Sequence, residues 1–244
     1  VASLVGWERF RASQFGIRHY CAIALNPKEA NDPVLADGVL ALLPRYLVKE
    51  GVLAVGEIGF DDQTPAEEEC FARHLELARR FDLPILVHTP HRDKKHGTER
   101  TLAILREHRF PMERALVDHN TEETLPLVLD AGAWAGHSIY PHTKMDEPRM
   151  AALVRRYGPE RILVNSAADW GVSDPLEVPK TVAEMRRAGI GERDIEQVVW
   201  KNPIAFFGQT GRLTIEDMEQ TQTIDQRCLF EGNSVLRGQA PVVR

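Results

Sequence analysis

Four side chains that can bind a metal ion stand at or just after the ends of short apolar runs: Glu57, His88, His119 and Asp169. A short apolar run is typical of a buried strand, and parallel strands deliver side chains at their carboxyl ends to one rim of a sheet. Glutamate, histidine and aspartate are ligands that catalytic zinc, manganese or magnesium ions accept. The series therefore predicts a centre for one or two divalent metal ions, either zinc, manganese or magnesium.

Each of these residues alone also has an ordinary structural explanation. A histidine at a strand end is more often hydrogen-bonded than metal-bound, and a glutamate after Val-Gly is more often an ion-pair partner. Asp169 could simply cap a turn. The four together favour the metal, because buried strand ends are poor places for unpaired ionisable groups.

The elements that would position these residues alternate along the chain. Glu57 to His88 and His88 to His119 are each 31 residues apart, the length of one strand and one helix. At the clearest helix start, Thr64 is a natural cap, Pro65 suits the first turn and Glu67 completes a capping box. We expect strands at 20–25, 52–57, 84–88, 115–119, 133–139 and 162–167, and helices at 35–49, 65–81, 98–108, 122–131, 147–157, 176–188 and 203–207.

Alternating strands and helices predict a parallel sheet, and the fold class that we predict is α/β, a TIM-type (β/α)8 barrel. The sequence shows six expected strands, whereas a closed barrel has eight. We therefore expect that about the first two βα units of the barrel precede Val1. Residues 1–213 would form the barrel, and the polar segment 214–244 would be a tail packed on the barrel or on a partner. An open doubly wound sheet is the alternative, but its glycine-rich phosphate turn is absent.

Composition narrows the functional class. The 244 residues carry a formal net charge of -6, so a nucleic-acid substrate is compatible with the chain but not favoured. No apolar run approaches the ~20 residues that cross a bilayer, so we expect no membrane partner. Three widely separated cysteines suggest neither a disulfide framework nor a metal site, which favours the cytoplasm. Nothing in the composition decides whether the protein is an oligomer.

Five local motifs follow one another along the chain: Val55 to Asp61, Pro84 to His88, Val117 to Asn120, Ser166 to Trp170 and Lys201 to Phe207. The ordered set is more specific than any single motif, and it resembles that of TatD-type metal-dependent hydrolases in the amidohydrolase superfamily. The resemblance covers about residues 15–213 and is closest to the TatD-related predicted TIM-barrel metal-dependent hydrolases.

The resemblance implies a role for each candidate ligand. Glu57 would bridge two metal ions, His88 and His119 would bind one of them, and Asp169 would bind the other. The family's His-x-His pair, which would complete the second position, is absent from this sequence. A metal-activated water would attack the substrate, and Asp169 would orient that water, accept its proton and return it to the leaving group.

Substrate contacts are expected from the loops after the ligand strands. His91 and Arg92 begin a basic stretch on this rim, and Lys144 follows the strand 133–139, so all three are candidates to bind a phosphate or carboxylate. We expect structural roles for His137 and His142. The favoured function is hydrolysis of a phosphoester, either a nucleotide or a nucleic-acid-like substrate, and the expected partner is a small-molecule or phosphoester substrate. Hydrolysis of an amide, lactone or other ester is the alternative, and a barrel used only for binding is a third.

Overall fold

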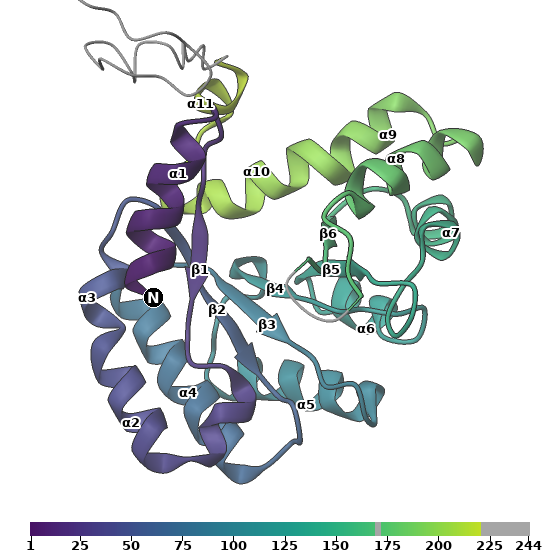
Figure 1. Ribbon diagram of the computed structural model, residues 1–244. Coiled ribbons are helices and arrows are strands. Elements are labelled where there is room, and N and C mark those ends of the chain that lie inside the picture. Colours follow the sequence, from purple (N-terminus) through teal and green to yellow (C-terminus); the bar gives the residue numbers. More distant parts are fainter. Residues whose placement is uncertain (169–171, 221–244) are drawn as a thin grey trace, which may run out of the picture.

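The chain forms one parallel sheet with its helices outside. A computed structural model describes residues 1–168 and 172–220, and in it six strands pair in chain order, each parallel to the next. Figure 1 shows the strands fanned through a curved sheet. The prediction of a parallel α/β sheet is therefore confirmed. The strands are β1 (Cys21–Ile23), β2 (Val52–Gly59), β3 (Ile85–His88), β4 (Ala115–Val117), β5 (Trp134–Ile139) and β6 (Ile162–Ser166).

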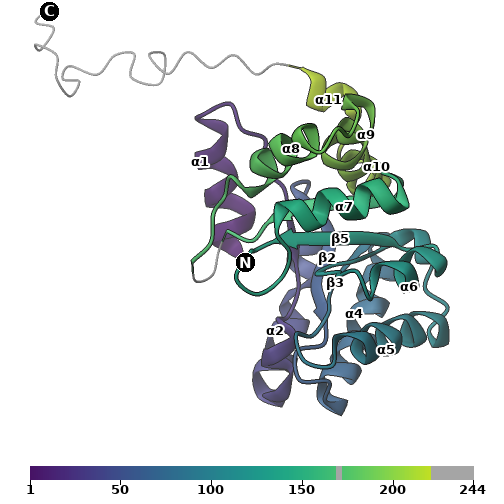
Figure 2. The ribbon, with the colours of Figure 1, turned by 90° about the vertical axis from the view of Figure 1, so that its right-hand side faces the viewer.

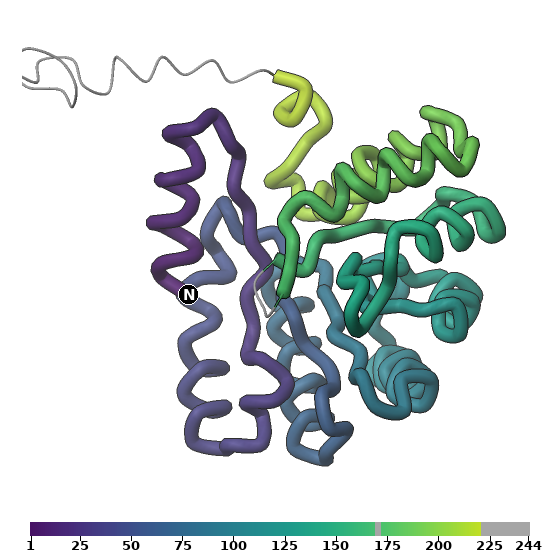
Figure 3. Tube along the Cα trace, turned by 45° about the vertical axis from the view of Figure 1, so that its right-hand side comes forward, coloured from purple at the N-terminus to yellow at the C-terminus, as the bar shows by residue number. Residues whose placement is uncertain are grey.

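Helices follow each strand and cover the outside of the sheet. In Figures 2 and 3 the strands lie at the centre, and the helices of successive βα units follow one another around them. Short 3-10 or π-helical turns occupy Ser3–Glu8, Pro27–Asn31, Met112–Arg114, Gln197–Lys201 and Gly208–Thr210. The α-helices are α1 (Arg9–Ser13), α2 (Pro33–Leu42), α3 (Pro44–Leu47), α4 (Pro65–Arg80), α5 (Lys94–Glu107), α6 (Leu125–Asp130), α7 (Glu147–Tyr157), α8 (Glu177–Arg187), α9 (Glu192–Glu196), α10 (Asn202–Phe207) and α11 (Ile215–Glu219).

Most helix boundaries follow the local signals in the sequence. Thr64 accepts the Glu67 amide hydrogen bond at 3.2 Å, as predicted, but the Glu67 carboxylate binds the amides of residues 61 to 63 and not that of Thr64, so only half of the predicted capping box forms. The predicted helix 35–49 is divided into α2 and α3, because Pro44 has no amide hydrogen and begins a new helix. None of the helices in the described part of the chain combines the length and apolar character that crossing a bilayer demands.

The outer face of the sheet carries the main core. Two apolar clusters fill the layer between strands and helices, one around β1 to β3 and the other around β5 and β6. A smaller cluster lies on the inner face, where Leu116 and Leu163 meet Phe206 of α10. α10 therefore closes the inner face of the sheet at one end.

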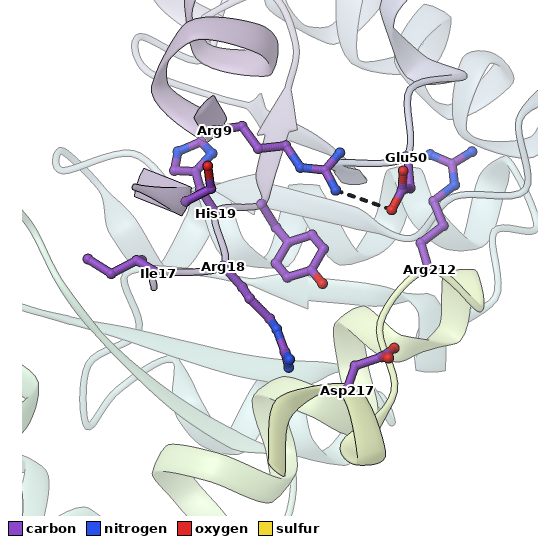
Figure 4. Close-up of a pocket in the computed structure, with 9 residues that line it drawn as sticks. Arg9, Ile17, Arg18, His19, Glu50, Arg212 and Asp217 are labelled. Atoms are coloured by element: carbon purple, nitrogen blue, oxygen red, sulfur yellow. Dashed lines mark hydrogen bonds and ion pairs between the residues drawn. The ribbon is translucent and has the colours of Figure 1, made fainter. Parts of the chain in front are cut away.

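The start of α10 and the segment after this helix bind the amino ends of two strands. Asn202 donates to the carbonyl oxygens of Pro159 and Ile162 at 2.7 Å each, just before and at the start of β6. Arg212 donates to the carbonyl oxygen of Val52, at the start of β2, at 2.6 Å. Arg212 also lines a cavity of about 320 Å³, where Arg9 pairs with Glu50 at 3.2 Å. Figure 4 shows the residues around this cavity. These contacts leave the carboxyl ends of the strands free for the candidate site.

Two buried histidines in this fold are neutral at neutral pH. His74 of α4 accepts a hydrogen bond from the Leu25 amide at 3.1 Å and donates to the Cys70 carbonyl oxygen at 2.7 Å. Nε2 of His137, in β5, is buried with no hydrogen-bond partner in the described residues. Burial lowers the pKa of each imidazole to about 4. His137 is fully buried within β5, and its structural role stays a prediction.

We expect His137→Leu to make the protein less sensitive to acid. Above pH about 6.5 the folded and unfolded states both hold neutral rings, and the full stability is present. As the pH falls from 6.5 to about 4, the unfolded chain takes up a proton that folded His137 does not, so the free energy of unfolding falls. Across this window the variant should lose on the order of 2–3 kcal/mol less than the parent.

Urea unfolding at a series of pH values, with a chelator present, measures this difference. His96→Gln on the exposed surface of α5 is the control, and its pH dependence should match that of the parent. The same pH dependence in His137→Leu would contradict the prediction.

Candidate metal centre

Three of the four predicted ligands meet at the carboxyl ends of β2, β3 and β4. Nε2 of His119 lies 2.9 Å from Nδ1 of His88 and 3.2 Å from Oε1 of Glu57. Oε2 of Glu57 lies 3.7 Å from Nδ1 of His88. One donor atom from each residue lies within 4.8 Å of the other two, so these residues form a group able to hold a metal ion.

Glu57 reaches this point because of an irregularity in β2. The register between β2 and β3 shifts between Gly56 and Ile58, so Glu57 is the extra residue of a β-bulge. A bulge re-aims one side chain within a strand, and Glu57 is 38% exposed in an otherwise buried strand. Gly59, with φ 123°, allows β3 to approach closely, since a Cβ there would lie 2.4 Å from the His88 carbonyl oxygen.

The donor set suits a divalent ion. Burial alone would raise the pKa of Glu57, but hydrogen bonds and charges from His119 and His88 outweigh it and hold that pKa well below its usual range. Glu57 therefore supplies a full negative charge at neutral pH. One carboxylate with two imidazoles is a ligand set that catalytic zinc accepts, with further positions left for water.

A buried carboxylate, Asp118, supports the backbone of His119 and the serine that contacts its ring. Asp118 is 4% exposed, and its Oδ1 accepts the His119 amide hydrogen bond at 2.7 Å. Asn165 of β6 donates to both oxygens of Asp118, at 3.2 and 3.0 Å. Ser138 of β5 lies 2.8 Å from Nδ1 of His119 and 3.5 Å from Oδ2 of Asp118. Partners of this kind fix the orientation of a metal-binding imidazole.

The space for this carboxylate depends on Gly136 of β5. A Cβ at this position would lie 2.5 Å from Oδ1 of Asp118, closer than real contacts allow. Glycine at 136 therefore lets Asp118 lie between β4 and β5.

A cleft of about 670 Å³ opens over the three ligands. Its polar wall includes Lys28 from the loop after β1, His91 from the loop after β3, and Lys144 from the loop after β5. Nζ of Lys144 lies 3.2 Å from Nδ1 of His119. Burial, together with the charges of Lys144 and Lys94, lowers the pKa of His91 to about 4, so His91 is neutral at neutral pH. The apolar floor consists of Leu86, Leu116, Leu163, Pro203 and Phe207.

Of the three residues predicted to bind substrate, two line the cleft and one does not. His91 and Lys144 line the cleft, whereas Arg92 points away, 89% exposed and 3.5 Å from Asp62. Asp169 lies outside the described residues, as does the C-terminal segment 221–244. Asn165 and Ser166, at the end of β6, do line the cleft.

Sequence reasoning missed several residues around the centre. Asp118 was not proposed as a site residue because the adjacent His119 was the ligand predicted for that strand. An aspartate at the end of an apolar run nevertheless itself indicates a candidate site residue. Asn165 and Ser138 follow the same rule, because both are polar residues near the carboxyl ends of strands. Lys28, in the 3-10 turn after β1, carried no such signal, whereas Lys94 at the start of α5 belongs to the basic stretch that the sequence itself indicates.

Comparisons with known proteins agree with this geometry. A family model described as TatD related DNase matches residues 8–208. An uncharacterized metal-dependent hydrolase of Methanocaldococcus jannaschii is 28% identical over 206 residues, which make up 84% of this chain and 80% of the relative. The crystal structure of a TatD-like protein from Archaeoglobus fulgidus has a TM-score of 0.66 at 28% identity and covers 84% of this chain and 78% of that one.

A solved structure with lower sequence identity has a similar fold. The phosphotriesterase homology protein from Escherichia coli, solved with phosphate in its active site, has a TM-score of 0.63 at 18% identity and covers 82% of this chain and 78% of that one. The curved parallel sheet is thus of the TIM-barrel type, as predicted. Fold and relatives together define the class as a metal-dependent hydrolase of the amidohydrolase superfamily. Within that class, the chain belongs to the TatD family.

Proposed function

We propose that this protein hydrolyses small phosphoesters at the centre formed by Glu57, His88 and His119. The observation that carries the proposal is the convergence of these three donors at the base of a cleft whose wall bears Lys28 and Lys144. Ammonium groups beside a metal centre favour an anionic substrate over a neutral one. The overall charge of -6 disfavours a long polyanion, so the proposed substrate is small.

Each residue of the metal centre has a separate role in the proposed reaction. Glu57 provides the negative charge that retains the ion, and His88 and His119 provide neutral nitrogen ligands. A bound divalent ion lowers the pKa of a water molecule and polarises the phosphoryl group. Ser138 contacts Nδ1 of His119 and so orients the ring, while Asp118 accepts the hydrogen bond of the His119 backbone amide. Lys144 lines the cleft and lies 3.2 Å from the same ring nitrogen.

We assign the proton transfers to Asp169. Its place after β6 follows the order of the family's motifs, and its carboxylate would orient the attacking water, accept its proton and return that proton to the leaving group. A second ion at Asp169 remains a prediction from the resemblance alone.

A second candidate is hydrolysis of lactones or other carboxylic esters. The apolar floor of the cleft favours this reading, since Leu86, Leu116 and Leu163 would pack against an uncharged substrate. The reaction would use the same centre and the same activated water.

The test is a substrate panel with the metal controlled. The protein is stripped with a chelator, reloaded with zinc, manganese or magnesium, and assayed on p-nitrophenyl phosphate, bis(p-nitrophenyl) phosphate, a γ-lactone and a p-nitroanilide. We expect phosphoester turnover that disappears with the chelator and returns with the metal. Preference for the lactone would instead support the second candidate. Stoichiometric metal without turnover of any substrate would contradict both.

A further inference from the structure

The carboxylate of Glu67, in the first turn of α4, is buried and binds a run of three backbone amides. Glu67 is 1% exposed. Its Oε2 accepts hydrogen bonds from the amides of Asp61 at 3.0 Å and Gln63 at 2.8 Å. Both of its oxygens accept from the amide of Asp62, at 3.1 and 3.2 Å. Consecutive amides that point at one anion form a concave nest, so this side chain fixes the conformation of the loop after β2.

The same carboxylate is joined to the 3-10 turn after β1. Nδ2 of Asn31, the last residue of that turn, donates to Oε1 of Glu67 at 3.0 Å and to the carbonyl oxygen of Lys28 at 3.3 Å. Oδ1 of Asn31 accepts a hydrogen bond from the hydroxyl of Thr64 at 2.6 Å. Glu67 therefore connects the loop after β2 with the turn after β1.

The loop after β3 is attached through Gln63. The main-chain amide of Gln63 binds Glu67, and its side-chain Nε2 donates to the carbonyl oxygen of Arg92 at 3.1 Å. Arg92 directly follows His91, which lines the cleft. Three successive loops at the carboxyl ends of β1, β2 and β3 thus depend on one buried side chain.

Each of these loops carries a polar side chain of the cleft wall. Lys28 comes from the turn after β1, Asp61 from the loop after β2 and His91 from the loop after β3. Among the described residues, Glu67 itself is not part of the cleft lining. Any effect of Glu67 on a substrate must therefore pass through the loops that it holds.

We propose that Glu67 is a positioning residue that holds Lys28 at the cleft wall and so sets the affinity for an anionic substrate without changing metal binding. The inference rests on the proposed function, in which Lys28 is one of two ammonium groups beside the centre. Lys28 is exposed, and a long exposed side chain has a defined position only where its backbone is fixed. Once the turn is loosened, substrate binding must also supply the free energy that orders it.

The first test substitutes the buried carboxylate in two steps. Glu67→Leu removes every acceptor and keeps most of the volume, whereas Glu67→Gln keeps one acceptor oxygen. With p-nitrophenyl phosphate we expect the KM to rise about 10-fold in Glu67→Leu and less in Glu67→Gln, with kcat and metal affinity within about twofold of the parent. Glu69→Leu, the same change on the exposed side of α4, is the matched control and should leave all three quantities unchanged.

A double-mutant cycle distinguishes positioning from a general loss of stability. Lys28→Met alone should raise the KM for p-nitrophenyl phosphate about 10-fold, and adding it to Glu67→Leu should raise the KM less than about twofold further, because both changes remove one interaction. Effects that multiply independently would overturn the inference. A Glu67→Leu protein that unfolds at lower urea concentration but keeps the KM of the parent would also overturn it, as would a parallel loss of metal affinity.

Asn31→Ala keeps the inference testable if Glu67→Leu does not fold. This change breaks the connection between Glu67 and the turn after β1, and it leaves the amides of residues 61 to 63 bound to the carboxylate. We expect the KM for p-nitrophenyl phosphate to rise about threefold while hydrogen exchange shows those amides still protected. The KM of the parent in a folded Asn31→Ala protein would overturn the inference.

A binding measurement separates this inference from the proposed function. Isothermal titration of inorganic phosphate into the metal-loaded protein should give an affinity that falls about 10-fold in Glu67→Leu and in Lys28→Met but not in Glu69→Leu. Equal phosphate affinity in the parent and all three variants would overturn the inference even if phosphoesters are hydrolysed. The expected loss of phosphate affinity, in a protein that hydrolyses no phosphoester, would support the inference and contradict the proposed function.

Discussion

Glu57→Gln should reduce both metal affinity and phosphoester turnover by about a thousandfold or more. Glu57 is the one carboxylate among the three convergent donors, and the two histidines hold its pKa well below the usual range. The amide removes that charge and keeps the size of the side chain. It also turns an NH2 group toward one of the two imidazoles, where a carboxylate oxygen now lies 3.2 Å from His119.

Metal affinity is measured by competition with a chromophoric chelator, and turnover is measured on the same samples. Glu69→Gln on the exposed side of α4 is the control. Circular dichroism of the chelator-treated proteins checks that both variants keep the fold. Stoichiometric metal bound to Glu57→Gln with unchanged affinity would contradict the ligand role of Glu57.

Asp169→Asn should lower turnover by about a hundredfold to ten-thousandfold while the ion at Glu57, His88 and His119 stays bound. An amide cannot accept a proton from the attacking water or return one to the leaving group. The two variants thus have different signatures, because the first loses metal and activity together and the second loses activity alone.

The same chelator competition and turnover assays decide this prediction, with Asp174→Asn, five residues further along the sequence, as the control. A fall from two bound ions to one in Asp169→Asn would place the second ion at this carboxylate. Turnover equal to that of the parent would rule out Asp169 as the proton acceptor.

The order of elements could be predicted from the sequence because the signals are local. Apolar runs define the six strands, and Thr64 with Pro65 defines the start of α4. The division of α2 from α3 at Pro44 follows the same chemistry. The curvature of the sheet comes from packing between strands, which no local pattern encodes.

The three convergent metal-ligand candidates could be predicted from the sequence, but the residues that surround and orient them could be predicted only in part. Glu57, His88 and His119 each end an apolar run, and parallel strands bring such ends to one rim. The bulge that aims Glu57 arises only from its pairing with β3. His91 and Arg92 are adjacent in sequence, yet one lines the cleft and the other pairs with Asp62 outside it. The direction of a loop side chain depends on contacts that the sequence does not display.

The close contact between Gly136 of β5 and Asp118 makes the residue types at these two positions depend on each other. A methyl group at position 136 would displace the carboxylate at 118, and loss of that carboxylate would remove the need for glycine. The two positions are therefore expected to change together across homologous chains. In a collection of related sequences, Asp at 118 should accompany Gly at 136, and this pairing would trace which members share the same support for their metal-binding histidine.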